Sequence, residues 1–288
     1  FKANLLPSRR FFAKLPEVIA LSPEKNEELF WEKKIAEYAI SAGFQEALVY
    51  ELTGERELAR FMLDSSRSCE LENPVNSDMR FLLPRALIKY IGNTAENLRN
   101  FDSVRMFGIA KSFISSDDLH TSHTEKKDLV FSYAKKGGDE KENFYMLKGV
   151  IDGMLDSLGI AEHWYDDAIP QETKKKLPMF HPYRVAEIKV GNTAIGMLGE
   201  IHPEVLNRLK TKTRIVAAEL DFETLWHLAR SEHEFLPASK FPAIVRDIAL
   251  IVPEATKVET ILNIIENEGG PLLEDTDLFD YFQDETMQ

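Results

Sequence analysis

Histidine side chains are the first candidates for chemistry, because four of the seven histidines occur in two pairs. His120 lies close to His123, and His181-Pro182 is followed later in the chain by His202-Pro203. Protein zinc sites take three or four ligands at characteristic spacings. Neither pair has a third ligand at such a spacing. We therefore expect no metal site and assign the two His-Pro pairs to turns.

Two pairs of adjacent carboxylates could supply acid–base chemistry: Asp117-Asp118 and Asp166-Asp167. We expect both to be solvated loop charge, the more usual state of such pairs. The lone Cys69 excludes an internal disulfide and fits a reducing compartment. We expect its thiol to be a small, half-buried apolar group rather than a reactive one.

The composition predicts a globular protein with more than one unit. The 288 residues are 44% hydrophobic and 29% charged, which is ordinary for folded chains. No apolar run approaches the roughly 18 residues of a membrane span, and no secretory signal opens the chain. We expect a cytoplasmic protein without membrane contact. Because the chain begins with Phe1, we expect its N-terminus to be a cut through a longer protein.

The net charge of −13 limits the possible partners. Phosphate contacts need clustered lysine and arginine. A nucleic acid must therefore meet a local basic patch, or basic surface on a partner chain. We expect no DNA binding.

The elements that position these residues can be predicted from periodicity. Residues 1–22 have no sustained period and predict a connector. Ser22-Pro23-Glu24 is a helix start, and Trp31, Ile35, Tyr38 and Ala42 form one stripe of the helix that follows. Gly43 is expected to end that helix.

Alternating and helical patterns continue to residue 230. The expected strands are Phe44 to Leu52, Val104 to Ala110, Leu129 to Tyr133, Val185 to Val190, Ala194 to Ile201 and Arg214 to Leu220. The expected helices are Met79 to Tyr90, Phe144 to Leu158, Pro203 to Leu209 and Phe222 to Ala229.

A polar linker, residues 231–239, predicts a domain boundary. Beyond it, Ile244 to Val252, Lys257 to Glu268 and Leu272 to Phe282 predict strand, helix and strand. Two strands and one helix cannot cover both faces of a sheet. We therefore expect residues 240–288 to be a truncated βαβ domain.

Several segments carry a family resemblance when they are taken in order. Gly43-Phe44-Gln45-Glu46 resembles the first signature motif of class II aminoacyl-tRNA synthetases. The other matching segments are Asn73-Pro74-Val75, Val104 to Ile109, the run from Phe180 to Ala186, the run from Ile195 to Leu206, and Phe241 to Leu250. Together they resemble the β subunit of the bacterial type of phenylalanine–tRNA ligase, across nearly all of residues 15–288.

The resemblance implies an α+β fold. Residues 23–230 would form a class II synthetase-like, mainly antiparallel sheet with flanking helices. Residues 240–288 would form a truncated ferredoxin-like anticodon-binding domain. The resemblance also implies that the first-motif helix packs between subunits. The expected interface residues are Phe30, Trp31, Ile35, Tyr38, Phe44 and Glu46, although plain core is the alternative for the aromatic stripe.

Departures from the family pattern predict a module without catalysis. Gly108 stands where the family usually has Glu, and no glycine-rich third motif ending in Arg is present. Gly196 to Glu200 supplies an acid where a triphosphate needs cations. The resemblance then implies that ATP, Mg²⁺ and phenylalanine are bound by the α subunit of an α₂β₂ assembly. We expect no catalytic, cofactor-binding or metal-binding residue in this chain.

The partners implied by the resemblance are the α subunit and tRNA(Phe). The candidate RNA-binding residues are Lys240, Arg246, Phe279 and Tyr281, although acids outnumber bases in residues 238–288. Two alternatives stay open. One is a free-standing, synthetase-like interaction protein without a role in aminoacylation, and the other is an independent small-molecule ligase.

Overall fold

The computed structural model describes residues 26–115, 123–137, 141–160, 162–230, 242–253, 256 and 258–282. The chain divides into two compact units, Phe1–Glu234 and Phe235–Gln288, and each is described by itself. The expected connector, residues 1–22, and linker, residues 231–239, lie outside the described residues, and their boundaries stay predictions. No helix of the described part is both long and apolar enough to span a membrane.

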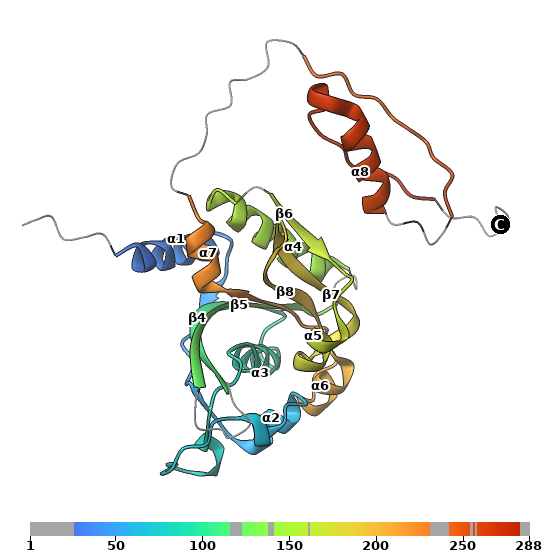
Figure 1. Cartoon of the computed structure of the whole chain (residues 1–288). Helices are drawn as coiled ribbons and strands as arrows, with labels where there is room; N and C mark the ends of the chain where they lie inside the picture. Colours follow the sequence, from blue (N-terminus) through green and yellow to red (C-terminus); the bar gives the residue numbers. More distant parts are fainter. Residues whose placement is uncertain are drawn as a thin grey trace, which may run out of the picture. The chain divides into compact units, whose positions relative to one another are not determined.

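The first unit is built on one large sheet, seven-stranded within the described residues (Figure 1). Its spatial order is β1 (Gln45–Glu46), β4 (Ser103–Ser115), β5 (His123–Lys135), β9 (Val216–Asp221), β8 (Thr193–Ile201), β7 (Phe180–Val190) and β6 (His163–Asp166). β1 pairs parallel to β4, whereas every other pairing in this sheet is antiparallel. The structure thus confirms a mixed α+β fold with a mainly antiparallel sheet.

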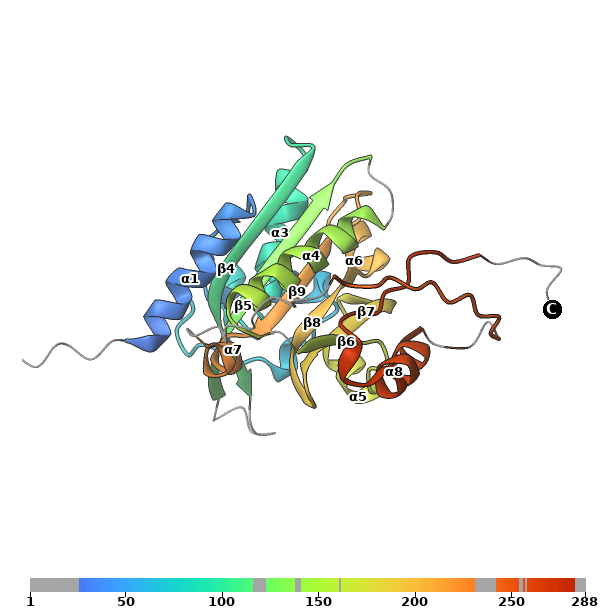
Figure 2. The same cartoon turned by 90° about the horizontal axis from the view of Figure 1, so that it is seen from above.

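Three helices cover one face of this sheet. They are α1 (Glu27–Ser41), α4 (Glu142–Ser157) and α7 (Phe222–Leu228), and Figure 2 shows α1 and α4 running along the strands. Their apolar stripes meet inward-facing strand residues such as Phe131, Leu198 and Ala218 in a continuous core. Lys127 on β5 fixes α1 by bonding Glu28 at 2.5 Å and Glu32 at 2.7 Å.

The opposite face is covered by α3 (Leu87–Asn97), which lies against the middle of the sheet, with α2 (Glu55–Arg60) and α6 (Pro203–Arg208) beside it (Figure 1). Tyr90, Ile91 and Ala95 of α3 pack on Val130 of β5 and Ala217 of β9. The central strands therefore have a packed core on both faces. α5 (Gln171–Lys176) lies between β6 and β7 in the chain, and β2 (Leu52–Thr53) pairs with β3 (Phe81–Leu82).

Two predicted elements differ in the structure. The single strand predicted for residues 44–52 is two short strands, β1 and β2, joined by residues 47–51, which belong to no strand although the Ala47 amide donates to the Phe107 carbonyl. The helix predicted from Met79 begins only at Leu87, because Pro84 disfavours helical geometry in the residue before it and has no N–H to donate. The start predicted at Ser22 lies outside the described residues. Within them, Asn26 caps α1 by accepting from the Leu29 amide at 3.1 Å.

The second unit contains the predicted helix, α8 (Val258–Gly269), followed by a 3₁₀ turn, Gly270–Leu272. The segments 242–253 and 273–282 form no strand, so the strands predicted there are wrong for the structure as described. A physical reason follows from the fold: the parallel strands of a split βαβ unit are separated by another strand. Neither segment therefore has a neighbour to pair with among the described residues.

Candidate functional site

The predicted stripe on α1 is divided between core and surface. Trp31 is 6% exposed and Ile35 is fully buried, and both pack in the chain's own core. Phe30 and Tyr38 are half-buried, and the Phe30 ring stands edge-on to Trp31 at 5.0 Å. Burial and nearby acids raise the pKa of the Tyr38 hydroxyl. A partner that contacts α1 would therefore not meet Trp31 or Ile35 directly.

The other two predicted interface residues, Phe44 and Glu46, are likewise divided between core and surface. Phe44 is buried and its ring is edge-on to Phe131 at 5.3 Å, so it is a core residue. Glu46 is exposed on β1, at the edge of the sheet. For Phe30, Tyr38 and Glu46 the interface assignment stays a prediction.

Exposed apolar side chains beside this edge were missed by sequence reasoning. Leu29 and Ile40 of α1 are both more than half exposed, and Leu48 and Tyr50 follow β1 at 92% and 76% exposed. Leu29 and Ile40 are eleven residues apart, which places them on the same side of a helix with 3.6 residues per turn. That spacing was a usable signal, but the stronger aromatic stripe on the opposite side of α1 obscured it.

The two His-Pro pairs fix turns, as predicted. Nδ1 of His181 accepts from the Tyr183 amide at 3.2 Å, and Nδ1 of His202 accepts from the Glu204 amide at 3.1 Å. His202 is also the N-cap of α6. At both sites the histidine ring therefore accepts from the backbone amide two residues later. This bond fixes the turn at the start of β7 and the turn at the start of α6.

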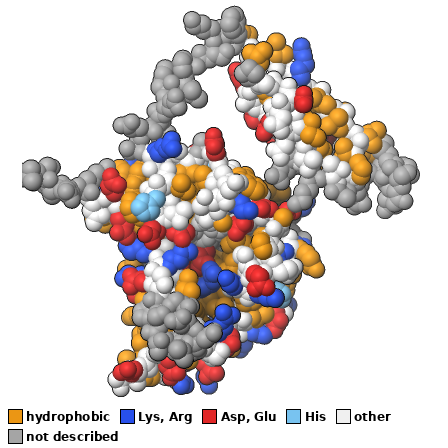
Figure 3. All heavy atoms as spheres, viewed as in Figure 1, with side chains coloured by type: hydrophobic (Ala, Val, Ile, Leu, Met, Phe, Trp, Pro, Cys, Tyr) orange, Lys and Arg blue, Asp and Glu red, His pale blue; other side chains and the backbone are white. Residues whose placement is uncertain are grey.

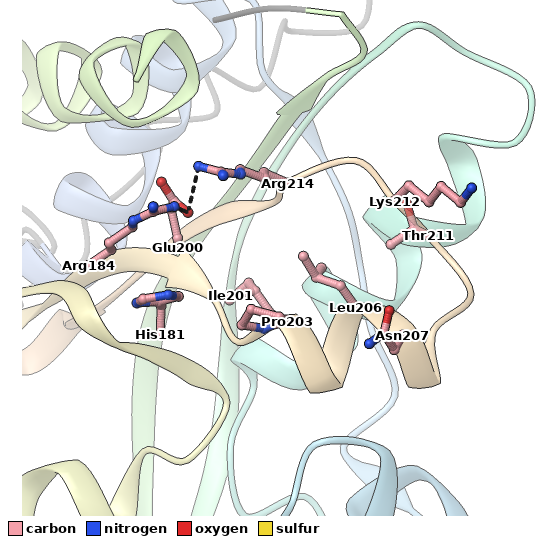
Figure 4. A pocket seen from close by; sticks show the side chains of 10 residues that line it. All are labelled: His181, Arg184, Glu200, Ile201, Pro203, Leu206, Asn207, Thr211, Lys212 and Arg214. Atoms are coloured by element: carbon pink, nitrogen blue, oxygen red, sulfur yellow. Dashed lines mark hydrogen bonds and ion pairs between the residues drawn. The ribbon is translucent and has the colours of Figure 1, made fainter. Parts of the chain in front are cut away.

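A pocket of about 470 Å³ lies beside these turns, and Figure 4 shows its lining. β7 contributes His181 and Arg184, β8 contributes Glu200 and Ile201, and α6 with the following loop contributes the remainder. Those remaining residues are Pro203, Leu206, Asn207, Thr211, Lys212 and Arg214. The volume is within the range of about 300–1,000 Å³ that is typical of ligand sites.

Two arginines neutralise the only acid among the residues that line this pocket. Nη1 of Arg184 lies 3.0 Å from Oε2 of Glu200, and Nη1 of Arg214 lies 3.6 Å from the same oxygen. Burial, followed by the charge of Arg184, lowers the pKa of His181. Gly196 to Glu200 therefore supplies an acid, as expected, but this acid is paired with two arginines on a surface that also carries Lys212.

A separate buried polar network lies under α3. Glu219 on β9 forms an ion pair with Arg85 and accepts from the Leu87 amide at 3.4 Å. Asp128 on β5 accepts from the Ser112 hydroxyl at 2.5 Å and lies 3.4 Å from the Lys126 ammonium. Burial and then the Glu219 charge raise the pKa of Asp128 to about 6.

These buried carboxylates do not fit a triphosphate. Asp128 and Glu219 would repel its phosphates, and Arg85 already has Glu219 as a partner. Gly108, where the sequence departs from the family pattern, is also closed: the Tyr90 hydroxyl and the Ala47 carbonyl occupy the space that a side chain would need. The network is better suited to anchoring α3 on the sheet than to binding a nucleotide.

The predicted RNA-binding residues belong to the second unit. Arg246, Phe279 and Tyr281 are exposed, whereas Lys240 lies outside the described residues. Figure 3 shows apolar side chains on the surface of this unit. The exposed apolar residues of the unit include Ile244, Val245 and Phe279. The assignment of these residues to RNA stays a prediction.

The remaining candidates make ordinary structural contacts. Asp166 bonds Lys189 at 2.6 Å, and the thiol of Cys69 is half-buried. Asp117, Asp118 and His120 lie outside the described residues. In the part of the chain that the structure describes, no group of three or more His, Cys, Asp or Glu is placed to hold a metal.

Comparison with known proteins first defines the class of fold. The chain resembles the solved structure of pyrrolysyl-tRNA synthetase from Desulfitobacterium hafniense with a TM-score of 0.55, over 69% of this chain and 67% of that one, at 15% identity. A likeness at this identity concerns the fold alone. Residues 239–288 match the model of the ferredoxin-fold anticodon-binding domain.

The particular family follows from residues 13–222, which match the phenylalanyl tRNA synthetase beta chain CLM domain. The chain belongs to this family. Similar proteins include the phenylalanine–tRNA ligase beta subunits of Clostridium tetani, 28% identical over 88% of this chain, and of Bacillus licheniformis, 28% identical over 95%. The chain spans about a third of the length of these curated relatives, 31% and 34% respectively.

Proposed function

We propose that the chain acts as the part of a phenylalanine–tRNA ligase β subunit that holds the catalytic α subunit and helps to position tRNA(Phe). The whole enzyme would attach phenylalanine to this tRNA at the expense of ATP. The observation that carries the proposal is the order of two modules, a CLM domain at residues 13–222 followed by an anticodon-binding domain at 239–288. The relatives that match 88% and 95% of this chain are named as β subunits of this ligase.

We assign the first unit to the class II synthetase type, without catalysis. The mainly antiparallel sheet with its parallel edge strand supports the fold assignment. The lack of catalysis is supported by the carboxylates and the helix that fill the centre of the sheet. ATP, Mg²⁺ and phenylalanine would then bind to the α subunit, in an α₂β₂ assembly in the cytoplasm.

The surface that we assign to the α subunit lies at the β1 edge. Leu29, Ile40, Leu48 and Tyr50 expose apolar area on α1 and just after β1. Exposed apolar side chains at the edge of a sheet are characteristic of a protein interface. Contact with a partner would remove the apolar area of Leu48 and Tyr50 from water, which stabilises a complex.

Co-purification tests this proposal. The chain and an α subunit with complete synthetase motifs are expressed together, and the expected result is a stable complex. A chain that remains monomeric beside α would favour the free-standing interaction protein. ATP–pyrophosphate exchange by this chain alone would instead establish an independent ligase and contradict the assignment of ATP to α.

A further inference from the structure

We propose that His163 is a proton-dependent clamp, whose charged ring fixes the end of α4 and, through it, Arg230, from which the chain continues toward the second unit. The inference goes beyond the proposed function and does not depend on it, because it concerns contacts inside the first unit. Its evidence is the arrangement of hydrogen-bond acceptors around one imidazole ring.

Both ring nitrogens of His163 face oxygen atoms that accept hydrogen bonds. Nδ1 lies 3.1 Å from the Ile160 carbonyl oxygen, and Nε2 lies 3.1 Å from Oδ1 of Asp152. Neither a carbonyl nor an ionised carboxylate has a proton to donate. Only the imidazolium carries a proton on both nitrogens and can donate both bonds. The observed geometry is therefore that of a charged His163, whose side chain is only 10% exposed.

Loss of the proton would break the bond to Ile160 rather than the bond to Asp152. A neutral ring has one N–H donor, so one nitrogen would present its lone pair to an oxygen. Burial opposes the charge of Asp152, but hydrogen bonds, including those from Lys148 and Tyr165, lower its pKa to about 2. Hydrogen bonds to a charged acceptor are the stronger ones. The neutral ring therefore keeps its proton on Nε2, toward Asp152, and releases the Ile160 carbonyl.

The Ile160 carbonyl belongs to the turn that ends α4. Gly159 has a positive φ of 74°, and its amide donates to the Asp156 carbonyl at 2.9 Å. The Ile160 amide donates to the Leu155 carbonyl, also at 2.9 Å. These are the two hydrogen bonds of a Schellman motif. Because Ile160 is 4% exposed, a released carbonyl would have little access to water, and an unpaired buried carbonyl is costly. The turn should therefore open more often when the ring is neutral.

The same turn holds the last described residue of the first unit before the gap at residues 231–241. The Arg230 amide donates to the Leu158 carbonyl at 2.8 Å. A Cβ atom at Gly159 would lie 3.1 Å from the Arg230 carbonyl oxygen, so the two backbones are in close contact there. An opening of the turn at Ile160 would therefore also loosen Arg230. The charge of His163 thus controls how firmly the chain is held where it leaves the first unit.

The groups around the ring favour its charged form. The hydrogen bond to Asp152 is the largest cause that raises the pKa of His163, and the charge of Asp156 adds to it. β7 places the uncharged Val190 opposite His163. The other titratable groups of this cluster are Lys148 on α4, which is paired with Asp152, Tyr165 on β6, and Tyr38 on α1. Because the pKa is raised above 6.5, the clamp is formed below pH 6.5 and is lost as pH rises through the folded pKa.

Native-state hydrogen exchange of the whole chain, from about pH 6 to about pH 9, tests the clamp. After correction for the intrinsic effect of pH on exchange, the protection of the Ile160 and Arg230 amides should fall several-fold over this range. The Phe44 amide is the matched control within the same chain. α1 ends in the same kind of turn, with Gly43 at φ 83° and a bond of 3.0 Å from the Phe44 amide to the Ala39 carbonyl. The protection of Phe44 should not change with pH.

A variant and a second measurement keep the test decisive. His163→Gln removes the titrating group, so the Ile160 and Arg230 amides should be less protected at pH 6 and should lose their dependence on pH. His227→Gln, at an exposed histidine on α7, should keep the dependence of the parent. Nitrogen-15 NMR of the His163 ring needs no variant. Both nitrogens should be protonated at pH 6, and the neutral ring at high pH should carry its proton on Nε2.

Each outcome decides the proposal. A loss of protection at Ile160 and Arg230 but not at Phe44, over the range in which the His163 ring titrates, supports the clamp. Equal changes at Ile160 and Phe44, or a ring that is already neutral at pH 6, overturn it. A titrating ring with unchanged protection at Arg230 also overturns it, because the ring would then not control the end of the unit. All these measurements use the chain alone, so they are independent of whether it binds α.

Discussion

The hydroxyl of Tyr90 occupies the space that a Cβ atom at Gly108 would need, and it donates to the Ala47 carbonyl at 2.9 Å. Tyr90 is fully buried in α3, and Gly108 lies on β4 directly beneath it. This packing gives a physical reason for glycine at a position where the resembling family usually has Glu. Gly108 and the buried Tyr90 side chain are therefore two parts of the same packing arrangement.

Gly108→Ala should therefore destabilise the chain by about 1–3 kcal/mol through overpacking. Tyr90→Phe removes the hydroxyl and should recover part of that destabilisation, so the double-mutant cycle should give a coupling of about 0.5–3 kcal/mol. Chemical denaturation of the four proteins measures it.

Gly149→Ala on α4 is the control for the change of residue type. Apart from its own helix backbone and chain neighbours, nothing lies within 4 Å of its added Cβ, and alanine is favoured in helices by roughly 0.5–1 kcal/mol. Additive effects of Gly108→Ala and Tyr90→Phe would mean that the two residues are not one packing unit.

The Gly108 environment also shows what sequence reasoning could achieve. Periodicity identified the helices that became α1, α4, α6 and α7, because their stripes repeat at helical spacing. It also found the β7–β8 hairpin from Gly191, which turns with a positive φ of 57°. Local sequence patterns were sufficient to predict an element wherever its structure depends on the residues of that segment alone.

Long-range pairings were not predictable in this way. Glu219 and Arg85 are 134 residues apart, and nothing in their local sequence indicates that they pair. The pocket likewise depends on β7, β8 and the loop after α6 meeting, so its arginines were not singled out from the sequence. Which of the two apolar sides of α1 is buried also depended on the elements that pack against it.

Asp128 predicts an unusual dependence of stability on pH. Its pKa is raised from 3.8 to about 6 in the folded chain, burial being the largest cause. The unfolded chain therefore releases this proton first, and stability falls as pH rises from about 4 to 6. The contribution is at most about 3 kcal/mol, because each pH unit corresponds to about 1.4 kcal/mol.

Asp128→Asn should remove this dependence and keep the acceptor for Ser112. As the pH rises from 4 to 7, the unfolding free energy of the Asp128→Asn variant should increase relative to that of the parent. Ser103→Ala, at the exposed start of β4, serves as a control for mutation in the same strand pair. A parallel pH profile for the Asp128 variant and the parent would show that Asp128 ionises normally.

Asp152 predicts the opposite dependence. Burial opposes its charge, but hydrogen bonds from His163 at 3.1 Å, Lys148 at 2.8 Å and Tyr165 at 2.6 Å prevail, and they lower its pKa to about 2. The hydrogen bond that His163 donates to Asp152 is the main cause that raises the pKa of His163. The Asp152 contribution is present above pH 4 and is lost as pH falls toward 2. The His163 contribution is present below pH 6.5 and is lost as pH rises through its folded pKa.

Asp152→Asn should therefore lower stability most between about pH 4 and 6, where both groups are charged in the folded chain. We expect a decrease of about 1 kcal/mol after allowance for partial exposure of the site. NMR titration of His163 gives an independent measurement, and its pKa should fall in the variant. Asp156→Asn, on the same helix and exposed, should have a smaller effect. An unchanged His163 titration would contradict the coupling.

Trp31 and Leu48 make opposite predictions for folding and for association. Trp31 is buried in the chain's own core, so Trp31→Ala should reduce stability by about 3–5 kcal/mol. Leu48 is 92% exposed, so Leu48→Ala should change stability by less than about 0.5 kcal/mol. If the β1 edge binds α, Leu48→Ala together with Tyr50→Ala should weaken the complex by more than about 1 kcal/mol.

Denaturation and calorimetric titration with α separate the effect on folding from the effect on association. Val75, which is 83% exposed and outside the helices and strands, provides the matched control as Val75→Ala. Equal association of the Leu48/Tyr50 variant and the parent would move the interface elsewhere, because the variant keeps its fold and differs from the parent only in this apolar surface.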